Sequence, residues 1–147
     1  MSEKTKGIAE QIVDCGVFRL KRGMMWRWTD APEENWHITG VSDGGLAGWI
    51  VNGANGDGFG FRLDELRGSN ARLVINDPAT KGCLLDLVRR TSGHRKLALM
   101  YDEDGWSWYD GTGGCSSGDP SEAKAFLHAL KMLSVYPGWP HAKKESA

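Results

Sequence analysis

The stretch from Trp36 to Ile75 constrains the fold most, because short apolar segments alternate there with glycine-rich turns. In order along the chain it reads "WHITGV", "SDGG", "LAGWIV", "NGANGDG", "FGFRL", "DELRGSN" and "ARLVI". Asn-Gly and Asp-Gly pairs provide the positive φ angles that tight hairpins require. The pattern therefore predicts an antiparallel meander. The adjacent acids of "LDELRG" leave a single helical turn open as an alternative within the last connection.

Strand structure is also expected just upstream, in "VFRLKRGMMWRW". Apolar residues alternate there in two short runs around Gly23, as they do in a hairpin or a bulged strand. Phe18 and Leu20 would then share one face, and Trp26 and Trp28 would share another.

The segment "KLALMYDEDGWSWYD" predicts a second hairpin, which turns at Asp104-Gly105. Its "WSWYD" echoes the "WRWTD" of the upstream stretch, and each motif follows a helix and a strand. A true internal repeat would place the two hairpins side by side in one sheet. Chance similarity over so few residues is the other interpretation.

Two helices are expected before this hairpin. The first covers about residues 5–15, where apolar residues form one stripe and Gly16 follows as a natural stop. The second begins with Asp77 as N-cap and Pro78 in the first helical position, and it ends shortly before Gly93.

The last helix opens at "DPSE", with Asp119 as its N-cap, Pro120 first and Glu122 completing a capping box. Residues 1–134 are thus predicted to form a single α+β domain, and 135–147 a partly flexible C-terminal tail. We expect an antiparallel sheet of about five to seven strands and three helices, the last two packed on one face. A chain of 147 residues can bury a core without metal or disulfide staples.

Charge and hydropathy narrow the class of protein. The net charge is −1, which disfavours both an acidic DNA mimic and a strongly basic duplex binder. The apolar runs are too short to cross a bilayer, and the polar start "MSEKTKG" lacks the apolar core of a secretory signal. The chain is expected to be cytoplasmic and not to interact with a membrane.

Two side chains are candidate nucleophiles, and both have a structural explanation. Cys83, in "NDPATKGCLLDLVRR", has the helical spacing of the leucines around it, so burial would make its thiol inert. Ser116, in "GCSSG", matches G-x-S-x-G. However, "DGTG" separates it from the preceding strand, and too few residues follow for an acid and a histidine on further strands. We therefore predict no catalytic residue and no enzyme.

Resident metals and cofactors are not expected either. The histidines and cysteines lack metal-ligand spacing such as H-x-x-x-H or C-x-x-C. The turn "NGANGDGFG" has one carboxylate, where calcium loops need several oxygen ligands. The loop "DGTGGCSSGDP" offers backbone amides to an anion, but Asp119 would repel one.

Cations interleaved with aromatics are the remaining candidates for binding. Such clusters suit single-stranded nucleic acid or a nucleotide, through phosphate pairing and base stacking. Tryptophan is also enriched at protein interfaces, and the chain has seven. The candidate binding residues are Arg22, Trp26, Arg27, Trp28, Arg95, Trp106 and Trp108.

The run "INDPATKGCLLDLVRR", from Ile75 to Arg90, resembles a segment of small bacteriophage and prophage proteins that reads N-D-x-A-T-x-G-C-L-L-x-L-V-R. A tryptophan-glycine pair often follows in those proteins, where this chain has "TSGH". The resemblance implies viral or prophage origin and an accessory role in the host cytoplasm, and it transfers no catalytic residue.

The predicted function is therefore non-enzymatic binding of a host or viral macromolecule, foremost a protein, such as a defence or regulatory factor that it inhibits. Self-association into a homo-oligomer would also suit exposed aromatic strands. The alternative is binding of a small anionic ligand, a nucleotide or single-stranded nucleic acid on a surface of tryptophan and arginine.

Overall fold

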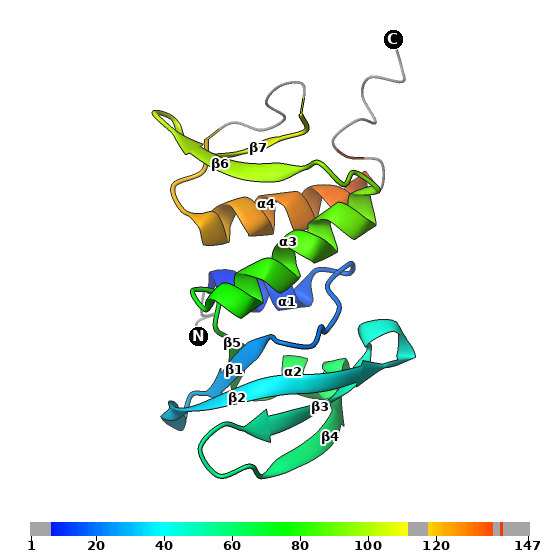
Figure 1. The fold of residues 1–147 in the computed structure, drawn as a ribbon, viewed down its shortest axis with the longest axis vertical. Coiled ribbons are helices and arrows are strands. Elements are labelled where there is room, and N and C mark those ends of the chain that lie inside the picture. The colour runs from blue at the N-terminus through cyan, green and yellow to red at the C-terminus, as the bar shows by residue number, and fades with distance from the viewer. Residues whose placement is uncertain (1–6, 112–117, 137–138, 140–147) are drawn as a thin grey trace, which may run out of the picture. The chain divides into compact units, whose positions relative to one another are not determined.

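The chain is an α+β protein, as the sequence predicts, and its strands divide between two sheets (Figure 1). The computed structural model describes residues 7–111, 118–136 and 139. It forms two compact units: Phe18–Cys83 with Met1–Asp14, and Leu84–Ala147 with Cys15–Val17.

The first unit contains a five-stranded antiparallel sheet with the order β4-β3-β2-β1-β5 (Figure 1). The predicted meander is confirmed in β2, β3 and β4, and β5 returns to pair with β1. The strands are β1 (Met25–Trp28), β2 (Ala31–Ser42), β3 (Ala47–Asn52), β4 (Gly58–Arg62) and β5 (Ala71–Leu73).

A short 3-10 turn, η1 (Asp43–Gly45), joins β2 to β3 and depends on glycine. Gly45 has a φ of 96°, which L-residues rarely adopt. A Cβ at this position would also lie 2.8 Å from the Cβ of Arg19. The turn is thus held against residues 19–20, and the amide of Leu20 donates to the carbonyl of Gly45 at 2.9 Å.

Of the hairpin or bulged strand expected around Gly23, only Met25–Trp28 is a strand, so the hairpin is not formed. Within the described chain, residues 17–24 lie outside any strand, because their backbone groups bond to other segments. The amide of Gly23, for example, donates to the carbonyl of Ile38 at 2.9 Å. Phe18 and Leu20 are nevertheless buried together, at 0% and 1% exposure.

The connection from β4 to β5 contains the helical turn that the sequence left open, α2 (Leu63–Arg67). Glu65 caps it by accepting the amide of Arg62 at 2.8 Å. Leu63 and Leu66 are buried, so the turn contributes to the core of this unit.

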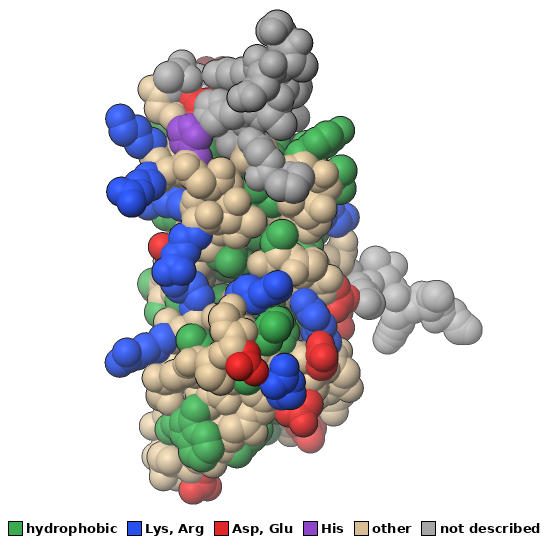
Figure 2. All heavy atoms as spheres, turned by 90° about the vertical axis from the view of Figure 1, so that its right-hand side faces the viewer, with side chains coloured by type: hydrophobic (Ala, Val, Ile, Leu, Met, Phe, Trp, Pro, Cys, Tyr) green, Lys and Arg blue, Asp and Glu red, His purple; other side chains and the backbone are tan. Residues whose placement is uncertain are grey.

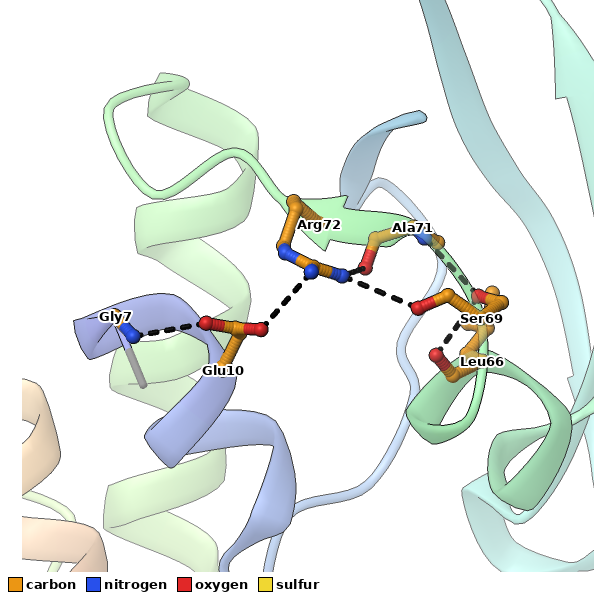
Figure 3. A network of polar contacts seen from close by, with 6 residues as sticks. All are labelled: Gly7, Glu10, Leu66, Ser69, Ala71 and Arg72. Carbon is orange, nitrogen blue, oxygen red and sulfur yellow. Dashed lines mark hydrogen bonds and ion pairs between the residues drawn. The ribbon is translucent and has the colours of Figure 1, made fainter. Parts of the chain in front are cut away.

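The first helix, α1 (Ile8–Asp14), packs beside β5 and α2 and buries Ile12 and Val13. Figure 3 shows the polar network that fixes it: Glu10 pairs with Arg72 of β5 at 3.0 Å. The same guanidinium donates to the carbonyls of Ser69 and Ala71 at 3.2 and 2.9 Å. This arginine and this carboxylate are thus engaged in holding the fold.

The helix α3 (Pro78–Ser92) begins where the sequence predicts. The carboxylate of Asp77 accepts the amide of Thr80 at 3.1 Å, which makes it the N-cap. The Thr80 hydroxyl, in turn, accepts the amide of Met25 at 2.9 Å and ties the helix start to β1.

The second unit contains β6 (Ala98–Asp102), β7 (Gly105–Tyr109) and α4 (Glu122–Val135). β6 and β7 form the predicted hairpin, with Glu103 and Asp104 as the two loop residues. This hairpin is a two-stranded sheet of its own, so β6 and β7 do not share one sheet with β1 and β2 as an internal repeat would require.

Trp108 is the centre of the second core, and α4 packs against its strand. The residue is 0% exposed, and its indole N–H donates to the carbonyl of Ala125 on α4 at 2.9 Å. Its ring makes edge-on contacts with Phe126 and Trp139, at centroid distances of 5.7 and 6.3 Å. Trp139, from the predicted tail, is therefore part of this core.

The predicted cap of α4 is wrong. Ser121 is the N-cap, and its hydroxyl accepts the amide of Lys124 at 3.2 Å. Asp119 is diverted because its backbone forms a bridge with Trp106, with both N–H···O distances at 2.8 Å. Its carboxylate instead lies 3.3 Å from Nδ1 of His128.

Candidate functional site

An open pocket of about 280 Å³ lies on the five-stranded sheet and is the best candidate for a binding site. We call it the aromatic pocket. Three strands and one turn contribute to it: β1, β2, β4 and the two-residue loop between β1 and β2. Its lining consists of Trp28, Asp30, Ala31, Glu34, Trp36 and Phe59.

Strand register explains why these side chains share one face. Trp36 lies directly opposite Trp26 of β1, and Ile38 lies opposite Ile50, which in turn lies opposite Phe59. Residues that face each other across an antiparallel pair project to the same side. Trp26, Ile38 and Ile50 are buried at 0–1% exposure, so the pocket continues the core face of the sheet.

The three rings form a compact cluster. Trp28 and Trp36 are 5.5 Å apart between centroids, Trp36 and Phe59 are 5.7 Å apart, and Trp28 and Phe59 are 6.1 Å apart. Their planes are inclined by 60–64°, the edge-to-face arrangement that aromatic quadrupoles favour. Such mutual contacts hold the rings in fixed positions.

The cluster is only partly covered. Phe59 remains 41% exposed, and both tryptophans are half-buried. An exposed apolar patch bordered by polar side chains is typical of an interaction site.

The polar border of the aromatic pocket is acidic. Asp30, in the loop after β1, is exposed, and Glu34 on β2 is half-buried. None of the ion pairs formed among the described residues includes either carboxylate. The pocket thus combines aromatic rings with two carboxylates, a combination that attracts positive charge.

The opposite face of the sheet is organised differently. Trp49, next to Ile50 on β3, is 49% exposed and lies over the glycines of β4. A Cβ at Gly58 would be only 2.8 Å from its indole nitrogen, and one at Gly60 would be 3.4 Å from its ring. This indole covers bare backbone, so it has a structural role that the rings of the pocket do not share.

The structure separates the residues that the sequence grouped on β1. Trp28 lines the aromatic pocket. Trp26 is a core residue at 1% exposure, and within the described chain its indole N–H has no hydrogen-bond acceptor. Arg27, between them, projects to the other side of the strand and donates to Asn35 at 2.8 Å. The arginine and Trp28 therefore do not form one surface.

The other predicted binding residues are also scattered. Arg22 and Arg95 are exposed. Trp106 is half-buried against Tyr101, at a centroid distance of 5.1 Å, and Trp108 is a core residue with no free ring face. In the lower half of Figure 2, where the five-stranded unit lies, basic side chains are mixed with acidic ones. The ion pair between Arg62 and Asp43 at 3.2 Å is one example.

Sequence reasoning missed Asp30, Glu34, Trp36 and Phe59. A usable signal was present, because Glu34, Trp36 and Ile38 alternate in "ENWHI" and so share one face of a strand. Only the pairing of β2 with β1 brings in Trp28, and only the pairing of β2 with β3 and of β3 with β4 brings in Phe59.

Of the two candidate nucleophiles, only Cys83 lies among the described residues. Cys83 is 8% exposed, and its thiol donates to the carbonyl of Arg22 at 3.3 Å, consistent with a structural role. Ser116 lies outside the described residues, as does most of the loop "DGTGGCSSGDP". In the described part of the chain, no group of three or more His, Cys, Asp or Glu side chains could hold a metal ion.

Comparison of the chain with protein-family models, with curated proteins and with solved structures gives no match. Among the helices of the described residues, none has the length and apolar character needed to span a bilayer.

Proposed function

We propose that this protein is a non-enzymatic binding protein that holds a partner protein on its aromatic pocket. The single observation that carries the proposal is the concave, partly exposed cluster of Trp28, Trp36 and Phe59 on the core face of the sheet. Aromatic side chains in partly desolvated pockets are the usual anchors of protein interfaces. Because the rings already hold one another, a partner would meet a preorganised surface at little entropic cost.

The resemblance of Ile75–Arg90 to phage and prophage proteins supports a role as a viral accessory protein. On this proposal the partner is a bacterial or viral protein, and binding blocks or redirects that partner.

The alternative, an anionic ligand or nucleotide, receives less support at this site. Asp30 and Glu34 would repel a phosphate that stacked its base on the rings. Arg27, the nearest predicted cation in sequence, projects to the opposite side of β1.

Site-directed photo-crosslinking in a bacterial host tests the proposal. A photoreactive phenylalanine analogue at Phe59 should give a covalent adduct of one defined mass, and Trp36→Leu in the same chain should abolish it. The matched control places the analogue at Trp49, which is similarly exposed but on the other face. Equal adducts from both positions, or an adduct that survives Trp36→Leu, would contradict the proposal.

A further inference from the structure

We propose that the aromatic pocket receives a basic side chain, arginine or lysine, from the partner protein. This inference rests on the proposed function and specifies the chemistry of the group that enters the site. Three independent features support it: the spacing of the rings, the position of the carboxylates and the size of the pocket.

The rings are spaced so that one cation can lie within range of all three centroids. Their centroids form a triangle with sides of 5.5, 5.7 and 6.1 Å. A group in van der Waals contact above the centre of this triangle lies about 5 Å from each centroid, inside the roughly 6 Å range of cation–π attraction. A guanidinium is especially suited, because it is weakly hydrated and stacks on aromatic planes.

The carboxylates are placed to complete such a site. Asp30 and Glu34 line the same pocket as the rings. Glu34 is half-buried, so a countercharge near it would be screened less than at an exposed position. A cation entering the pocket would therefore meet aromatic rings and negative charge together, whereas a neutral or acidic group would meet only the rings or be repelled.

The size and composition of the site match a long amphipathic side chain. A pocket of about 280 Å³ exceeds what one ammonium group fills. Arginine and lysine bury an aliphatic stem along apolar surface while their charged end reaches a polar partner. In this site the stem would lie against the apolar part of the lining, and the charged end would lie over the rings beside the carboxylates.

Titration with capped amino acids tests the inference on the intact protein. The probes are N-acetyl-arginine amide and N-acetyl-lysine amide, with N-acetyl-citrulline amide as the neutral isostere of arginine. The readout is the indole N–H resonances of the seven tryptophans, with those of Trp28 and Trp36 assigned by substitution. The basic probes should shift these two signals saturably and bind about five-fold or more tightly than citrulline, since a cation–π contact is typically worth about 1 kcal/mol.

Two matched pairs of variants locate the effect. Glu34→Gln should lower the preference for arginine over citrulline to about two-fold or less, whereas Glu33→Gln, on the exposed side of the same strand, should leave it unchanged. Trp36→Leu should abolish the shift at Trp28, while Trp49→Leu should preserve it. Glu34→Gln keeps size and hydrogen bonding, and its thermal unfolding provides the check that the fold is intact.

The outcomes separate this inference from the proposed function. Equal binding of citrulline and arginine, or no saturable shift from either basic probe, would show that the pocket does not receive a basic side chain. The proposal that a partner protein binds at the pocket would then still depend on the crosslinking result alone. Failure of the crosslinking experiment would contradict binding of a partner protein at the pocket, even if the pocket bound the arginine probe.

Discussion

Each unit contains a Trp-x-Trp strand, and the two strands use their indoles differently. In both, one tryptophan is in the core: Trp26 is 1% exposed and Trp108 is 0% exposed. The other indole is half-buried in each case. Trp28 meets two further rings and an acidic border, whereas among the described aromatic side chains Trp106 contacts only Tyr101.

The difference shows what turns a surface tryptophan into a binding group. Trp106 is on a strand whose backbone is closed by the bridge to Asp119, and its ring has one aromatic neighbour. Trp28 forms one wall of a concavity that also contains carboxylates. A half-buried indole by itself indicates packing. A concave group of rings beside carboxylates that form no ion pair among the described residues indicates a binding site.

The largest expected effect contrasts the two indoles of the second unit. Trp108→Ala should lower the free energy of unfolding by about 3–5 kcal/mol, because it leaves a cavity in the core. Trp106→Ala should cost about 1–2 kcal/mol, mainly the stacking on Tyr101. Urea denaturation of both variants measures the difference, and equal losses would show that the two indoles are not divided between core and surface.

A second prediction contrasts the two buried indoles through their N–H groups. Trp108→Phe leaves the carbonyl of Ala125 without its donor, but Trp26→Phe removes an N–H that has no acceptor among the described residues. Trp108→Phe should therefore cost about 0.5–1.5 kcal/mol more than Trp26→Phe, the usual net contribution of one hydrogen bond. Chemical denaturation checks this, and a larger loss for Trp26→Phe would contradict it.

The parts of the fold that depend on turns and caps formed by neighbouring residues could be predicted from the sequence. Glycine turns located β2, β3 and β4, and Asp77 with Pro78 located the start of α3. Asp119 was mistaken for a cap because its pairing with Trp106 is a contact between distant residues. Division into two sheets likewise depends on pairing that a single sequence does not specify.

The aromatic pocket was only partly predictable for a related reason. β2 begins at Ala31, although "APEEN" contains proline and acids that strands rarely favour. Its pairing with β3 also shifts register between Ile38 and Gly40. A bulge of this kind interrupts simple alternation, so counting residues does not show that Trp36 and Trp49 lie on opposite faces.

A smaller effect on stability separates the pocket from the core of its own sheet. Phe59→Leu keeps an apolar side chain at a position that is 41% exposed, so the free energy of unfolding should change by about 1 kcal/mol or less. The same change should weaken binding of the arginine probe about two-fold or more, because one cation–π contact is lost. Phe61→Leu is the matched control, since Phe61 is 8% exposed on the same strand and should cost more stability. Reversed results would place Phe59 in the core.

The smallest expected effect concerns a carboxylate beside an aromatic side chain in the second unit. The hydroxyl of Tyr109 donates to Asp102 at 2.9 Å, and this hydrogen bond, with the negative charge of Asp102, raises the pKa of Tyr109. A tyrosine whose pKa is raised by folding contributes stability at neutral pH, and this contribution is lost as the pH rises through the raised pKa. The relevant pH window is therefore alkaline, above the ordinary tyrosine pKa of about 10.

Alkaline titration of tyrosinate absorbance, compared with Tyr109→Phe, should give a midpoint that Asp102→Asn lowers clearly. Asp104→Asn should lower it less, because Asp104 acts only through its charge and is the weakest cause. An unchanged midpoint in Asp102→Asn would mean that Asp102 does not accept a hydrogen bond from Tyr109 in solution. Asp102 would then no longer differ from Asp30 and Glu34 of the aromatic pocket in being engaged by a neighbouring side chain.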